Sequence, residues 1–193
     1  LSKLGDLSSI TGRQVYNSTE SSTSNITILG VVGISVTGSI DFGDGTTAED
    51  VSITLATMAG YNNTDFGFND CTVIPGPCSG IVIENTGNVN ANVTVNISES
   101  GVDFIGGTGG GTMVFQAFDG NLTGDQDGCS DLGGLTNFEQ FSAFGDLKKF
   151  CANLSYVDSA DKVTFEFAIN IPSDAPPTVG NNQATLTFFA LEV

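Results

Sequence analysis

Alternation of apolar and polar residues is the feature that most constrains how this chain folds. Over residues 89–97, the apolar side chains of Val89, Val93, Val95 and Ile97 all stand at odd positions. Because successive side chains of a strand point to opposite faces of a sheet, this pattern predicts a strand with one buried face. The same reasoning predicts further strands at 51–55, 81–83, 113–115, 163–171 and 186–190.

Turn signals separate these segments and indicate the fold class. Gly, Asn, Asp and Pro gather at 43–45, 84–87, 106–111 and 172–177, and such clusters are typical of turns between strands. Fourteen Phe residues further favour strands over helices. We therefore expect an all-β protein, with a jelly-roll or immunoglobulin-like β-sandwich.

One segment departs from the strand pattern. Residues recurring at helical spacing predict a short helical insertion over about 137–151, and they are Phe138, Phe141, Phe144, Leu147 and Cys151. Lys148 and Lys149 would then lie on its solvated face.

The N-terminal part divides into a tail and an unusually long apolar pattern. We expect residues 1–25 to be a flexible tail and residues 26–193 to form a single β-sandwich domain. The alternation over residues 26–42 corresponds to about 55 Å of strand, far beyond the usual five or six residues. Either this strand bends at a glycine and changes sheet, or its first part leaves the domain.

A departing strand is a candidate for donation to a neighbouring subunit. Main-chain hydrogen bonds and alternating side chains hold such a strand in a groove, and head-to-tail contacts of this kind grow filaments. Both Leu1–Val15 and the segment 26–36 are candidate donors. The latter alternates more cleanly, through Ile26, Ile28, Val32, Ile34 and Val36.

Sequons for N-glycosylation are abundant and indicate export. Seven of the sixteen asparagines stand in Asn-X-Ser/Thr triplets. They are Asn17, Asn25, Asn62, Asn92, Asn96, Asn121 and Asn153. Asn92 and Asn96 occupy even positions of the 89–97 strand, so we expect both on its outward face.

The four cysteines also favour an oxidising compartment. Their spacings of six and twenty-one intervening residues do not suit a four-cysteine zinc site. We expect two disulfides, and we prefer Cys71–Cys78 and Cys129–Cys151 among the three connectivities because each closes a local loop. Leu1 is not an initiator methionine, so we interpret the chain as a processed, extracellular form.

Composition excludes several functions. A net charge of −17 repels nucleic acid and anionic lipid, and no apolar run is long enough to span a bilayer. Without histidine, a Ser-His-Asp triad and His-ligated metals are excluded. We therefore expect no enzyme.

The remaining candidate chemistry is a weak calcium site. Asp125, Asp127 and Asp131 provide hard oxygens at short spacing, although a solvated loop explains them as well. A second cluster at Asp41–Gly45 with Glu49 and Asp50 has the same ambiguity.

Three short motifs carry a resemblance to a known group of proteins. They are Ser35-Val-Thr-Gly-Ser-Ile-Asp-Phe-Gly43, Ile83-Glu-Asn-Thr-Gly-Asn-Val-Asn-Ala-Asn-Val-Thr-Val95 and Ile171-Pro-Ser-Asp-Ala-Pro-Pro177. Their order over residues 35–193 resembles that of secreted prokaryotic β-sandwich proteins, namely archaeal surface-filament or bundling-pilus subunits and TasA/camelysin-like biofilm fibre proteins. The resemblance implies a jelly-roll subunit joined to its neighbours by N-terminal donor-strand exchange.

These observations lead to one expected function and one alternative. We expect a structural subunit of an extracellular glycosylated filament, a pilus or matrix fibre, that forms a homopolymer at the cell surface. The alternative is a cell-surface adhesin or surface-layer domain stabilised by Ca²⁺.

Overall fold

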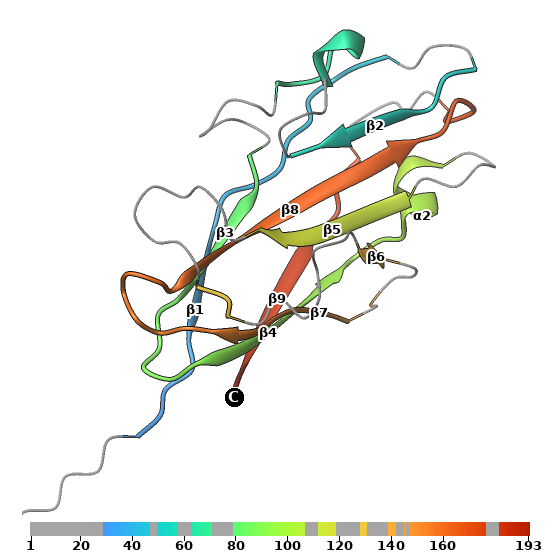
Figure 1. The fold of residues 1–193 in the computed structure, drawn as a ribbon. Helices are drawn as coiled ribbons and strands as arrows, with labels where there is room; N and C mark the ends of the chain where they lie inside the picture. The colour runs from blue at the N-terminus through green and yellow to red at the C-terminus, as the bar shows by residue number, and fades with distance from the viewer. Residues whose placement is uncertain are drawn as a thin grey trace, which may run out of the picture.

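A computed structural model of the chain describes residues 29–46, 50–57, 63–70, 79–106, 112–118, 128–130, 139–141, 145, 147–176 and 182–193. Within these residues, two antiparallel sheets enclose one hydrophobic core (Figure 1). The all-β sandwich expected from the alternation is therefore confirmed.

The larger sheet has six strands in the order β1-β3-β8-β5-β6, with β2 also paired to β8. Its strands are β1 (Ile34–Thr37), β2 (Ile53–Ala56), β3 (Ile81–Asn85), β5 (Thr112–Phe118), β6 (Glu139–Phe141) and β8 (Lys162–Ile171). β8 organises this sheet because β5 pairs along one of its edges, while β3 and β2 share the other edge.

The smaller sheet has three strands in the order β7-β4-β9. They are β7 (Lys148–Leu154), β4 (Ala91–Ile97) and β9 (Leu186–Glu192). In the central strand, Val93, Val95 and Ile97 are buried, whereas the residues between them are half-buried on the outer face. The facing predicted for the 89–97 segment is therefore correct.

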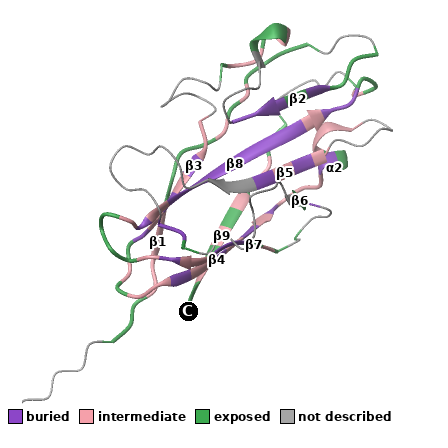
Figure 2. Cartoon of the chain, in the orientation of Figure 1, coloured by how far each residue is buried: buried purple, intermediate pink, exposed green. Residues whose placement is uncertain are grey.

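A cluster of phenylalanine rings joins the two sheets. Phe165 on β8 lies 5.4 Å from Phe115 on β5 and 5.3 Å from Phe188 on β9, between ring centroids. Phe150 on β7 completes the cluster at 5.6 Å from Phe165. Burial is continuous from Val163 to Ile169 of β8 (Figure 2), because this strand is covered on both faces over that stretch.

The helix predicted over residues 137–151 is wrong. Residues 139–141 and 148–154 form β6 and β7. Phe141 is buried and stacks on Phe115 at 4.5 Å, whereas Leu147 is exposed. The pairing of β4 with β7 is irregular, and the successive residues Phe150 and Cys151 of β7 are both buried. The helical spacing in the sequence therefore comes from buried residues of two separate strands.

The described helices lie elsewhere and are short. α2 (Gly101–Ile105) begins after Ser100, whose side-chain oxygen accepts a hydrogen bond from the Asp103 main-chain nitrogen. The 3-10 helix η1 spans Asn63–Phe66.

The long apolar pattern over residues 26–42 becomes one short strand in its described part. β1 ends at Thr37, and Gly38 adopts a φ of 112°, a conformation that glycine reaches without steric cost. Ile40 and Phe42 then pack against the core from outside the sheet. The strand therefore ends at a glycine, but the described residues 39–46 after it join neither sheet, so the change of sheet in one of the two sequence interpretations is not seen among them.

Candidate functional site

The smaller sheet ends at an edge to which no described strand pairs. Hydrogen bonds at Ser98–Thr185 and Asn90–Val193 fix the register of β4 with β9. Because hydrogen-bonded pairs alternate in an antiparallel ladder, the main-chain groups of residues 187, 189 and 191 point to β4. Those of Leu186, Phe188 and Ala190 point away from it. We call these last groups the β9 edge.

A large cavity lies beside the β9 edge, between the two sheets. Its volume is about 1200 Å³, and we call it the seam cavity. Its apolar lining comes from both sheets, and includes Leu55, Ile81, Phe167, Ile169, Ile97, Leu186 and Phe188. Exposed residues such as Ser39, Asp41 and Gln183 form its rim.

The seam cavity is suited to hold an apolar chain segment. Among its described lining residues, only Asp41 and Asp44 are titratable. The Asp41 carboxylate accepts a hydrogen bond from the Gly43 main-chain nitrogen over 2.8 Å, so it supports its own turn. The apolar residues that both sheets contribute to the lining can bury the apolar side chains of a partner segment.

The edge strand of the larger sheet bounds the opposite side of the cavity. β1 pairs antiparallel with β3 of the same chain, Ser35 lying opposite Glu84. Val32 and Ile34 pack against the core, and the exposed Val36 lines the seam cavity. These three predicted donor residues therefore belong to their own domain in this structure, whereas Ile26 and Ile28 lie outside the described residues.

Residues 29–33, which we call the arm, extend the pairing of β1 beyond its first residue. The Asn88 side chain makes hydrogen bonds to the main chain of the arm, as a neighbouring strand would. Its Nδ2 donates to the Leu29 oxygen over 3.1 Å, and its Oδ1 accepts from the Val31 nitrogen over 2.6 Å. The Gly33 oxygen accepts a further bond from the Thr86 nitrogen. At Gly87, any Cβ would collide with the Val31 oxygen, so only glycine permits this close approach.

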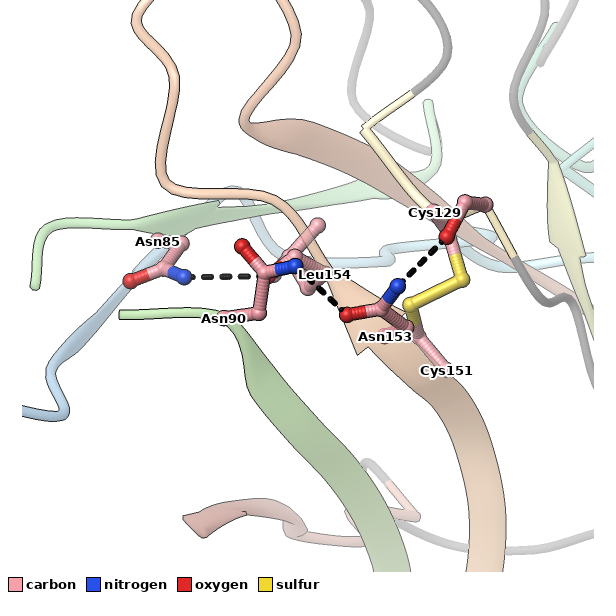
Figure 3. The surroundings of a disulfide bond; sticks show 7 residues. Asn85, Asn90, Cys129, Cys151, Asn153 and Leu154 are labelled. Atoms are coloured by element: carbon pink, nitrogen blue, oxygen red, sulfur yellow. Dashed lines mark hydrogen bonds between the residues drawn. A yellow bond between two sulfur atoms is a disulfide. The ribbon is translucent and has the colours of Figure 1, made fainter. Parts of the chain in front are cut away.

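A polar network closes the sandwich at the arm end (Figure 3). The buried Asn85 side chain donates to the Val89 and Leu154 oxygens over 2.9 and 3.0 Å. Asn90 Nδ2 donates to Asn153 Oδ1 over 2.8 Å. The predicted Cys129–Cys151 disulfide is confirmed, and it lies beside this network. One end of the sandwich is therefore closed, while the seam cavity lies toward the other.

The structure describes three of the seven sequon asparagines. Asn92 and Asn96 lie on the outer face of β4. Asn153 is engaged through both side-chain atoms, since its Nδ2 also donates to Ser130 Oγ over 2.7 Å. The other four sequon asparagines lie outside the described residues, and they are Asn17, Asn25, Asn62 and Asn121.

The remaining predicted site residues are not brought together by the described structure. Cys71, Cys78, Asp125, Asp127 and Asp131 lie outside the described residues, as does Glu49. In the part of the chain that the structure describes, no group of three acidic or thiol side chains gathers in a metal-binding arrangement.

Sequence reasoning missed one buried carboxyl. Glu166 on β8 accepts a hydrogen bond from the Thr57 hydroxyl at the junction of β2 and β3. The Thr57 oxygen in turn accepts from the Phe167 nitrogen over 2.9 Å. Burial raises the pKa of Glu166, and the bond from Thr57 offsets part of this shift. Its even position in the β8 alternation predicted an outward polar residue and gave no signal of burial.

Comparison with known proteins adds no assignment. Neither a family model, nor a curated protein, nor a solved structure matches the chain. Among the described residues, no helix has the length and apolar character needed to cross a bilayer. The functional conclusion therefore depends on the geometry of the sandwich.

Proposed function

We propose that this chain is the structural subunit of an extracellular glycosylated filament, in which the N-terminal segment of one copy occupies the seam cavity of the next. The observation that carries the proposal is the seam cavity, with apolar residues from both sheets in its lining, beside the β9 edge, to which no described strand pairs. An extended peptide satisfies both features, because its side chains fill the cavity while its main chain pairs with the edge.

The direction of the chain favours a second copy as the source of this segment. The arm lies near the C-terminal end of β9, since a Cβ at Gly30 would meet Glu192 Oε1 at 3.1 Å. The cavity is lined by Leu186 and Phe188 toward the other end. Val36 and Gly38 line the cavity. Followed backward from them, the chain runs through β1 to the end of the sandwich at which the C-terminus lies (Figure 1). Donation between copies in this arrangement is head-to-tail and does not close.

Leu1–Val15 is the better donor of the two candidate segments. Residues 32–36 already fill their own sandwich and pair with β3, or with the turn that follows it. Using them as donor would cost these contacts in every subunit. Leu1–Val15 contains Leu1, Leu4, Leu7 and Ile10. Residues 16–28 then form a link of up to about 43 Å when fully extended.

Charge substitution within Leu1–Val15 tests the proposal. In the exported full-length protein, we expect Leu4→Asp with Leu7→Asp to abolish filaments in electron micrographs and to leave monomers in size exclusion. Ser8→Asp with Ser9→Asp adds the same charge without removing apolar side chains, so it should still polymerise.

Two outcomes would contradict this function. Filaments that persist after deletion of residues 1–15 would exclude this donor. A native protein that stays monomeric, and whose melting temperature falls in EDTA, would instead favour the calcium-stabilised adhesin or surface-layer domain.

A further inference from the structure

The outer face of the smaller sheet carries an exposed apolar strip. Phe189 is 45% exposed and Leu191 is 67% exposed, both on β9. Their neighbour Phe188 points inward and contacts the rings of Phe150 and Phe165. An aromatic ring on the solvent face of an edge strand is a surface that a partner commonly covers.

Two sequon asparagines flank this strip on the adjacent strand. Thr94 lies directly opposite Phe189, and Asn92 lies directly opposite Leu191. Asn96 lies opposite Thr187, so both asparagines are diagonal neighbours of Phe189. Diagonal neighbours in an antiparallel pair are about 7–8 Å apart, which is within reach of an aromatic side chain.

The chemistry of a sugar suits this position. A glycan on Asn92 or Asn96 begins at the Nδ2 atom on the same face as the ring. Sugar rings present C–H groups as well as hydroxyls, so one face can cover apolar surface while the hydroxyls stay in water. Because it is covalently attached, the sugar pays no cost of association from solution.

A second copy of the chain is the competing occupant of the strip. Glycans on both asparagines of the central strand would hold a neighbouring copy away from this face. The net charge of −17 also opposes close contact between copies. The flanking sequons therefore favour the chain's own glycans over another subunit.

We propose that Phe189 is the platform on which the N-linked sugars of Asn92 and Asn96 rest. The modification requires a sugar activated by a phosphate ester at its anomeric carbon, supplied by the export machinery. The Nδ2–carbon bond forms, the carbon–oxygen bond to phosphate breaks, the phosphate leaves, and the amide loses one proton. The sugar then shields Phe189 and Leu191 from solvent.

A thermodynamic cycle on the exported full-length chain tests this proposal. Mass spectrometry of the peptides carrying Asn92 and Asn96 first establishes the attached sugar. We expect Phe189→Ala to lower the melting temperature of the glycosylated protein by about 2–4 °C. In the sugar-free background of Asn92→Gln with Asn96→Gln, the same change should have less than about a third of that effect. Val102→Ala, which shortens a similarly exposed apolar side chain on α2, is the matched control and should behave alike in both backgrounds.

Three results would overturn the proposal. Unmodified peptides at both sequons would show that no sugar is attached beside Phe189. An equal effect of Phe189→Ala in both backgrounds would show that the ring stabilises the folded protein without contacting the sugar. Sugar-free protein that associates through this face, and stops doing so in Phe189→Ala, would assign the strip to a second copy. None of these results depends on filament formation, so the filament function is tested separately.

Discussion

The Nδ2 of Asn85 on β3 donates to the Leu154 oxygen on β7 over 3.0 Å, so that one buried amide ties the larger sheet to the smaller. The same Nδ2 bonds the Val89 oxygen, and Oδ1 accepts from the Gly87 nitrogen over 2.9 Å. The end of the sandwich at which the arm is docked is therefore closed by hydrogen bonds, whereas the seam cavity is bounded by strand edges.

Replacement of Asn85 by alanine should destabilise the protein strongly. It leaves two carbonyls and one amide nitrogen without their side-chain partner, and buried unsatisfied groups cost about 1–3 kcal/mol each. We expect the free energy of unfolding to fall by about 2–4 kcal/mol in urea titration. Asn170→Ala is the control, because it removes one exposed hydrogen bond to Thr54. Similar losses for the two variants would contradict the role of Asn85.

A disulfide engineered between β1 and β3 distinguishes the two candidate donors. Ser35 and Glu84 are opposite each other, and such residues have Cα atoms about 5.5 Å apart, within disulfide range. With Leu1–Val15 as donor, Ser35→Cys with Glu84→Cys should form an intrachain bond inside intact filaments. Non-reducing gels should then show monomers. A ladder of covalent oligomers would show that β1 is exchanged between subunits, and Ser35→Cys alone controls for random oxidation.

Hydrogen exchange should detect pairing at the β9 edge. In the isolated subunit, the amides of Leu186, Phe188 and Ala190 face no described strand, so they should exchange faster than those of residues 187, 189 and 191. On polymerisation we expect the fast set to become protected and the slow set to change little. Filaments that leave the fast set unprotected would show that the cavity is filled without strand pairing.

Glu166 should make stability depend on pH in a defined direction. Because burial raises its pKa in the folded state, its contribution is fully present below the ordinary Glu pKa and is lost as pH rises through the raised value. Glu166→Gln should therefore be more stable than the natural protein at neutral pH, and the difference should vanish in acid.

Melting temperatures of both proteins between pH 4 and pH 8 provide the measurement. Glu192→Gln removes a charge from an exposed side chain and controls for net charge, which also changes stability with pH. An identical pH profile for Glu166→Gln and Glu192→Gln would exclude the buried carboxyl as the cause.

Local patterns were reliable where a strand packs one face on the core. The alternation in residues 89–97 and 163–171 predicted β4 and β8, and short sequence separation predicted the Cys129–Cys151 bridge. In these segments the period of the side chains and the tertiary burial agree. The helix prediction for residues 137–151 was wrong because Phe141 and Phe150 pack against rings of other strands, Phe115 and Phe165. The spacing of residues within one segment does not reveal such contacts.

The sequence by itself determined the strands that pack one face on the core, such as β4 and β8, the outward face of Asn92 and Asn96, and the Cys129–Cys151 bridge. Only the tertiary structure decided that Val32 to Val36 remain in their own domain and that none of the described strands pairs with the β9 edge beside the seam cavity. Alternation is set by the backbone of one segment and can be read locally. Whether an edge strand is paired depends on strands that are distant in the chain, so it cannot be read from the edge strand's own sequence.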